Sequence, residues 1–216
     1  MKLISVNVAQ PREICWKDRV VSTGIFKEPI AGRVAVRKHN LDGDRQADLS
    51  VHGGAAKAVY AYASEHYDFW REELPDVEFA WGKFGENLTT QGLSEDAAFV
   101  GDHFRMGSSI LMVTQPRLPC YKLAAKFNRD DIIERFLHRG RSGIYFSVIE
   151  EGELGAGDKI ELLQREQTEI SIATVVQIFL GQIIDPSLIE KAAALSVLPP
   201  FWRKRFRSII KANLSD

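Results

Sequence analysis

Short segments in which apolar and polar residues alternate fill most of the chain before residue 165. Glycine or proline separates them, and the clearest are residues 2–8, 32–38, 57–62, 103–107, 108–114, 143–149 and 158–164. Alternation with a period of two is typical of strands that bury one face. Because long crossover helices are missing between these segments, the pattern predicts a mainly β fold, an antiparallel β-barrel or sandwich.

Helical periodicity interrupts the predicted strands in three places. The first insert follows Ser64, a residue type that caps helices, and ends before Pro75. The second begins near Pro119 and runs to Phe127, and the third covers residues 130–138. We therefore expect a barrel with helical inserts.

The pattern becomes helical throughout after about residue 165. Segments 171–184, 186–196 and 200–213 each begin beside a serine, aspartate or proline, as helices often do. We predict two domains, a β-barrel over residues 1–165 and a small three-helix bundle over residues 166–216. A bundle this short is marginally stable alone, so we expect it to dock on the barrel.

Composition and charge narrow the classes of protein. The chain has 45% hydrophobic and 26% charged residues, and its formal net charge of -1 gives no global field that would attract nucleic acid. We see no unbroken apolar run of about 18 residues and no signal peptide, so no membrane association is expected. The two cysteines, Cys15 and Cys120, form no disulfide framework, which indicates a cytoplasmic location. We expect Cys15 to be a small buried hydrophobe.

Cys120 is the strongest candidate for chemistry. It follows an apolar strand within the run Pro116-Arg117-Leu118-Pro119-Cys120 and stands at the predicted start of a helix. Helix amides, Arg117 and Lys122 favour a charged sulfur at this position, which makes it a better ligand or nucleophile. A buried cysteine that packs as a small hydrophobe is the alternative.

A second candidate site is the glycine loop with His52, Gly53, Gly54 and Lys57. Adjacent glycines let backbone N–H groups approach an anion, and lysine adds a point charge. The Walker A spacing is absent, and a glycine turn with a solvated lysine explains the segment equally simply.

Further candidates lie in other loops. Arg45 and Lys27 are cations beside glycine, and Glu86 and Asn87 follow Gly85, where they orient a ligand or cap a turn. The five histidines show no zinc-type spacing, and the cysteines give no second thiolate for a metal.

Together, several of these motifs resemble the MOSC domain family, named after the C-terminal domain of molybdenum cofactor sulfurase. They are Lys27, GDRQAD at 43–48, VHGGAAKAVYAY at 51–62, FGENL at 84–88, the Pro-Arg-x-Pro-Cys run at 116–120 and the Gly-x-Gly-Asp turn at 155–158. The helical tail with Trp202 resembles the YiiM group of that family. The resemblance therefore covers nearly the whole chain.

The resemblance implies a β-barrel that binds molybdenum cofactor, a pterin dithiolene with a phosphate. The family's molybdenum-ligating cysteine falls on Cys120, and a soft thiolate suits that metal. The other implied cofactor ligands are cationic or polar residues: Lys27, Arg45, His52, Gly53, Gly54, Lys57, Glu86, Asn87 and Arg117. His52 is also an implied catalytic residue, which hydrogen-bonds an oxo ligand or the pterin, or donates a proton to departing water.

The resemblance also implies an activity. Such members are associated with reductive detoxification of N-hydroxylated bases such as hydroxylaminopurine, which makes this chain a molybdenum-dependent oxidoreductase that converts N–OH to N–H. Two cysteines hold no iron–sulfur cluster, so a separate electron-donor protein, a reductase, is required.

Two points stay open at this stage. The RKRFR run at 203–207 docks that donor, a second subunit of a homodimer or nucleic acid, or it is a solvated amphipathic helix. The alternative function is a sulfur or molybdenum-cofactor carrier that uses a persulfide or thiolate at Cys120.

Overall fold

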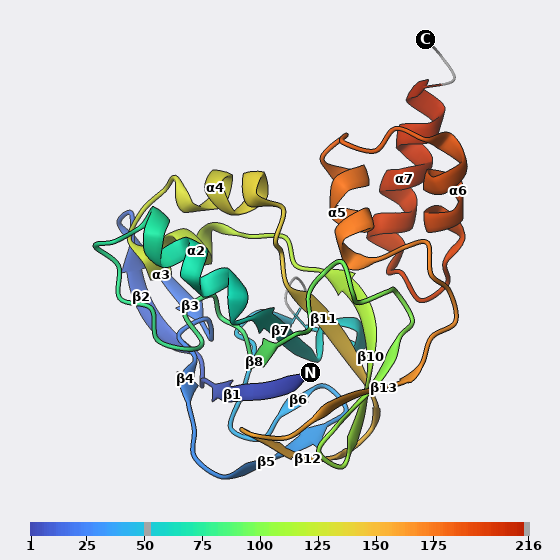
Figure 1. Ribbon diagram of the computed structural model, residues 1–216. Coiled ribbons are helices and arrows are strands. Elements are labelled where there is room, and N and C mark those ends of the chain that lie inside the picture. Colours follow the sequence, from blue (N-terminus) through green and yellow to red (C-terminus); the bar gives the residue numbers. More distant parts are fainter. Residues whose placement is uncertain (50–52, 214–216) are drawn as a thin grey trace.

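An eight-stranded mixed sheet forms the centre of the molecule (Figure 1). The computed structural model describes residues 1–49 and 53–213. In sheet order the strands are β13 (Ile160–Gln164), β9 (His103–Met106), β10 (Ser109–Pro116), β11 (Ile144–Glu150), β7 (Val59–Ala63), β8 (Leu88–Gln91), β1 (Lys2–Val8) and β4 (Glu28–Pro29). All seven predicted strands are present, six of them in this sheet, which also contains the unpredicted strands β4 and β8.

The sheet differs from the predicted antiparallel barrel in two respects. β7 and β8 run parallel, because α2 (Glu65–Glu73) and the loop after it carry the chain back to the start of β8. The sheet is also open, since β1 and β13 share only the bridge between Lys2 and Lys159 and a few backbone hydrogen bonds. Beyond Ile160, β13 is exposed and pairs with β9 alone, so β13 and β1 diverge before a full ladder forms between them. The fold is therefore mixed α/β.

Two smaller sheets flank the large one. β5 (Arg33–Arg37) pairs with β6 (Asn40–Leu41) and β12 (Gly152–Gly155), and β2 (Arg12–Trp16) forms a hairpin with β3 (Arg19–Thr23). β12 and β13 pair with different strands, so the glycine turn between them joins two sheets and does not close the simple hairpin that its sequence suggests.

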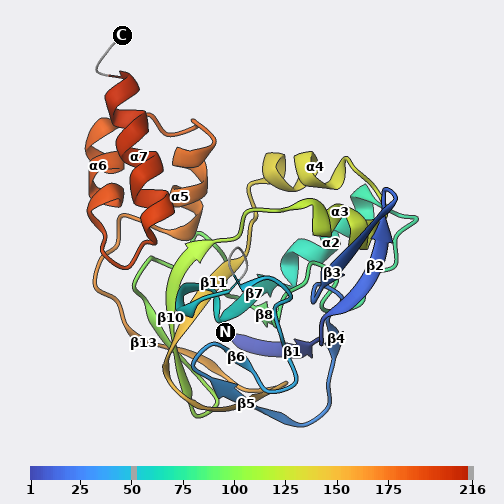
Figure 2. The same ribbon diagram turned by 180° about the vertical axis from the view of Figure 1, so that it is seen from behind.

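The helices lie in two groups, which both views of the ribbon separate (Figures 1 and 2). The first group is α2, α3 (Tyr121–Phe127) and α4 (Ile132–Arg139), with the β2–β3 hairpin beside α3. The second group is α5 (Ile172–Phe179), α6 (Pro186–Ala194) and α7 (Pro200–Asn213). All six predicted helices are present. α5 is shorter than predicted, because the chain turns at Gly181, whose φ is 72°. No helix in the described part of the chain is long and apolar enough to cross a membrane.

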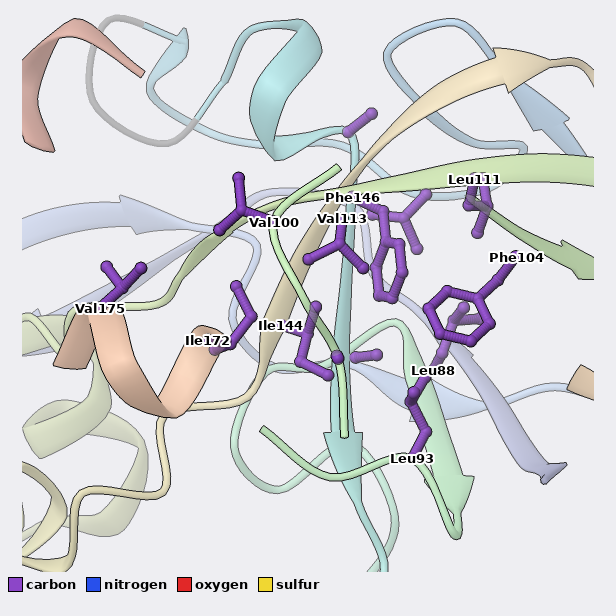
Figure 3. Packing of buried hydrophobic residues seen from close by; sticks show 14 of the residues in the cluster. Leu88, Leu93, Val100, Phe104, Leu111, Val113, Ile144, Phe146, Ile172 and Val175 are labelled. Atoms are coloured by element: carbon purple, nitrogen blue, oxygen red, sulfur yellow. The ribbon is translucent and has the colours of Figure 1, made fainter. Parts of the chain in front are cut away.

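The main core joins the large sheet to the C-terminal helices (Figure 3). Leu88 and Phe146 of the sheet belong to the same buried cluster as Ile172 and Val175 of α5. A second, aromatic cluster fills the space under α2, α3 and α4. The domain boundary near residue 166 stays a prediction, and segments on both sides of it contribute to the main core.

Candidate functional site

A cleft lies where the end of the β2–β3 hairpin, the 44–47 loop, the 3-10 turn η1 (Ala55–Lys57) and the start of α3 meet. The predicted site residues that line it are Lys27, Arg45, Lys57, Asn87, Arg117 and Cys120. Segments far apart in the sequence thus place five cations or polar groups around one thiol.

Cys120 is held at the junction of a strand and a helix. β10 pairs with β11 as far as Pro116, and Pro119 cannot donate to a ladder, so the chain leaves the sheet here. Cys120 then caps α3 with an extended backbone, and its side chain is half-buried in the cleft wall. Lys57 of η1 interacts electrostatically with it: burial lowers the pKa of Lys57, and the neighbouring sulfur opposes that shift.

Arg117 is the most unusual cation of the cleft. Its residue is 6% exposed, yet its Nη1 atom has no hydrogen-bond partner among the described residues. The guanidinium carbon lies 5.0 Å from the ring centre of Tyr60 and 5.6 Å from that of Phe136, which hold its orientation by cation–π contact. Lys122, also buried, adds a second cation to the same wall. A buried donor that lacks a partner points to an anionic ligand.

Lys27, in contrast, has its own counter-ion. It forms a buried ion pair with Asp44, whose second oxygen accepts a hydrogen bond of 2.9 Å from the Asn87 side chain. The backbone N–H of Ala9 also donates to Asp44 at 2.9 Å. Burial lowers the pKa of Lys27, and Asp44 opposes that shift. This cluster fixes the hairpin end and the 44–47 loop against the sheet.

Glu86 is not among the residues that line the cleft, and its predicted ligand role stays a prediction. The carboxylate is fully buried and accepts hydrogen bonds from the N–H groups of Gly82 and Phe84, and from the hydroxyls of Thr89 and Tyr67. Oε1 accepts three of these hydrogen bonds and Oε2 accepts one, so both carboxylate oxygens bond to groups inside the protein. Glu86 shapes the loop that presents Asn87.

The glycine loop is only partly tested by the structure. Gly54 precedes η1 with a φ of 94°, a left-handed conformation that favours glycine. Neither Gly53 nor Gly54 is among the residues that line the cleft. His52 lies outside the described residues.

Sequence reasoning missed two tyrosines of the site. Tyr60 and Tyr145 line the cleft with ring centres 5.1 Å apart, and burial raises the pKa of both hydroxyls, so they stay neutral. The sequence predicts the strands that contain both tyrosines. It does not show which face of the sheet the Tyr60 side chain lies on, because β7 is buried on both faces.

The described residues show no metal site made of protein side chains, and Cys15 lies on the surface. In residues 1–49 and 53–213 no group of three or more His, Cys, Asp or Glu residues is arranged to hold a metal ion. Cys15 is exposed on the β2–β3 hairpin, so the prediction that it is buried is wrong. Strand β2 pairs only with β3, and no apolar layer covers its outer face at that position.

Comparison with known proteins gives consistent relatives. The model of the MOSC domain matches residues 48–161. The chain is 37% identical to YflK of Bacillus subtilis, over 94% of this chain and 92% of that protein, and 39% identical to Protein YiiM of Escherichia coli, over 88% and 78%.

A more distant relative and a solved structure add to this. A protein of Gibberella moniliformis named Reductase is 30% identical over 88% of this chain, which aligns with 35% of that protein. The crystal structure of YiiM from Geobacillus stearothermophilus superposes with a TM-score of 0.80 and 33% identity, and covers 97% of this chain and 98% of that one.

Proposed function

Because the chain belongs to the MOSC domain family and is YiiM-like, we propose that its cleft binds molybdenum cofactor. We further propose that the protein is an oxidoreductase that reduces N-hydroxylated compounds, including N-hydroxylated bases such as hydroxylaminopurine. The single observation that carries the proposal is the buried Nη1 of Arg117, unpartnered among the described residues, in the same cleft as the thiol of Cys120.

The residues present fit such a cofactor chemically. A phosphate and an oxyanionic metal centre need cations, and the cleft offers Arg117, Lys122 and Lys57. A dithiolene-bound metal accepts a further soft ligand, and Cys120 is the one thiol that lines the cleft among the described residues. Tyr60 and Tyr145 present neutral aromatic surface beside these charges, which suits a planar heterocycle.

Each of these residues then has a distinct task. Cys120 would ligate the metal, and Arg117 and Lys122 would bind the phosphate or the oxyanionic end. Lys57 and the exposed Arg45 would screen negative charge at the mouth of the cleft. Asn87 would keep Lys27 and Asp44 in register, and His52 is proposed as the proton donor. When bound, the cofactor supplies a metal that exchanges an oxygen atom and two electrons.

The overall reaction consumes two electrons and two protons, breaks the N–O bond and releases water, so N–OH becomes N–H. The printed name of the Gibberella moniliformis relative, Reductase, supports reduction as the reaction class. Two cysteines do not hold an iron–sulfur cluster, so we propose a separate electron-donor protein as partner. We also propose that the protein forms a homodimer.

Elemental analysis tests the proposal. Wild type, Cys120→Ser and the matched control Cys15→Ser are produced in a host that makes the cofactor, next to a known molybdoenzyme. We expect near-stoichiometric molybdenum in wild type and Cys15→Ser, a strong loss in Cys120→Ser, and reduction of hydroxylaminopurine by the loaded protein with an artificial electron donor.

Two results would overturn the proposal. Wild type without molybdenum, beside a fully loaded reference enzyme, excludes the cofactor site. A labile sulfur on Cys120 without metal identifies the protein as a carrier of a persulfide.

A further inference from the structure

The base of α7 is joined to β10 by a hydrogen bond from a buried indole. Trp202 is 1% exposed and packs against Phe179 and Phe206, with ring centres 5.4 and 6.1 Å away. Its Nε1–H donates a buried hydrogen bond of 2.9 Å to Oε1 of Gln115, a residue of β10. The two residues are 87 positions apart in the chain.

The side chain of Gln115 also forms a hydrogen bond to η1. Its Nε2 donates to the backbone oxygen of Ala56 at 3.2 Å, and the hydroxyl of Thr114 donates to the same oxygen at 2.7 Å. Ala56 immediately precedes Lys57, which lines the cleft and interacts with Cys120. The side-chain amide of Gln115 is thus fixed at one end by α7 and holds η1 at the other.

η1 has little structure of its own to fix its position. It is three residues long, has no side-chain hydrogen bond at its N-cap, and includes a backbone hydrogen bond from the N–H of Lys57 to the oxygen of Gly54 at 2.9 Å. Short 3-10 turns are weak elements that depend on their surroundings. The hydrogen bonds that Ala56 accepts from β10 add to the contacts of η1 with β11 and help to place Lys57.

We infer that Trp202 and Gln115 are positioning residues: α7 orients the Gln115 amide, the amide fixes η1, and η1 places Lys57 beside Cys120. This gives the C-terminal helices a task at the cleft. The inference rests on the cleft being the functional site and does not depend on which reaction occurs there.

The test measures how fast iodoacetamide alkylates Cys120 at one fixed pH in the cofactor-free protein. All variants carry Cys15→Ser, because Cys15 is exposed and would also react. Lys57→Met sets the reference rate, since it removes the ammonium group that interacts with Cys120. We expect Trp202→Phe and Gln115→Met each to slow alkylation by about threefold or more, toward the Lys57→Met rate.

Two further comparisons separate positioning from simple loss of stability. The double variant is expected to react no more slowly than either single variant, because both changes break one chain of contacts. Ile189→Val, a buried change in α6 away from Gln115, is the control for a weakened core, and its rate is expected to equal that of the parent. Unfolding in urea confirms that each variant is folded. If Trp202→Phe folds poorly, Gln115→Met still tests the same series of hydrogen bonds from the β10 side.

Equal alkylation rates in Trp202→Phe, Gln115→Met and Ile189→Val would overturn the inference, as would fully additive effects in the double variant. Because the protein is measured without cofactor, a wrong functional proposal would show in the molybdenum analysis and leave this result unaffected.

Discussion

Replacing Asp44 by asparagine should destabilise the protein strongly and in a pH-dependent way. The Asp44 side chain is 1% exposed and that of its partner Lys27 is 8% exposed. Asparagine keeps the shape but offers one oxygen and one NH₂ group where Asp44 offers two acceptors. Its donors are Lys27 and the N–H of Ala9 at one oxygen and Asn87 at the other, so the donors on one side then face another donor.

The structure sets the size of the effect. Removing one partner of a buried ion pair costs about 3 to 5 kcal/mol, because the remaining charge is buried without compensation. The folded variant limits this loss by releasing the proton of Lys27, which at pH 7 costs about 5 kcal/mol for a lysine of ordinary pKa and at pH 9 only about 2 kcal/mol. In that range the unfolded chain binds one more proton than the folded variant, so the variant's stability rises with pH. The deficit at pH 7 is therefore expected to shrink to about 2 kcal/mol at pH 9.

Urea denaturation of wild type and Asp44→Asn at pH 7 and pH 9, followed by tryptophan fluorescence, measures both values. Asp42→Asn is the matched control, since Asp42 pairs with Arg37 on the surface and its loss should leave stability almost unchanged. A deficit below about 1 kcal/mol, or one that is the same at both pH values, would contradict the assignment of Lys27 and Asp44 as a buried charged pair.

Three further predictions use other contacts. Burial lowers the pKa of Lys126 to about 7, so between pH 7 and 10 the unfolded state binds one more proton than the folded state. The free energy of unfolding of wild type should therefore rise relative to that of Lys126→Met by up to about 1.4 kcal/mol per pH unit. Parallel pH profiles of the two free energies would contradict this. Gly143→Ala places a Cβ 2.5 Å from the oxygen of Ala61 at a φ of 72°, so we expect a loss of about 2 kcal/mol or more in thermal unfolding, and an unchanged Tm would refute the strain. Arg117→Met is expected to stay folded and to lose bound molybdenum, and a variant that keeps the molybdenum content of wild type would contradict the proposed role of Arg117.

Local chemistry made most of the fold predictable. Strand periodicity, proline and glycine located β1, β7 and β10 and the α-helices α2 to α7. β8 was missed, since its sequence LTTQ is polar. It is buried because Thr89 bonds to Asn7 and Glu86, contacts that no local pattern reveals.

The candidate site was predictable in its members and unpredictable in their roles. Cations beside glycine and a cysteine after proline mark the chain segments that approach a ligand, and six of these residues meet in one cleft. Glu86 and Asn87 are neighbours in the same loop, and the sequence does not distinguish their roles. The difference lies in their partners: the Glu86 carboxylate accepts four hydrogen bonds from inside the protein, and these partners are set by tertiary contacts.

The partners of the cations also decide where an anion gains most. At Lys27 an incoming anion competes with Asp44, which already holds the ammonium and is itself held by Ala9 and Asn87. At Arg117 it displaces no partner of Nη1 among the described residues, and it relieves a buried donor whose desolvation has already lowered the stability of the free protein. We therefore expect an anionic cofactor to gain most of its binding energy at Arg117, in the same cleft as Cys120, while Lys27 holds the hairpin end and the 44–47 loop in place. Charge and burial alone make the two residues look alike, and only their hydrogen-bond partners distinguish them.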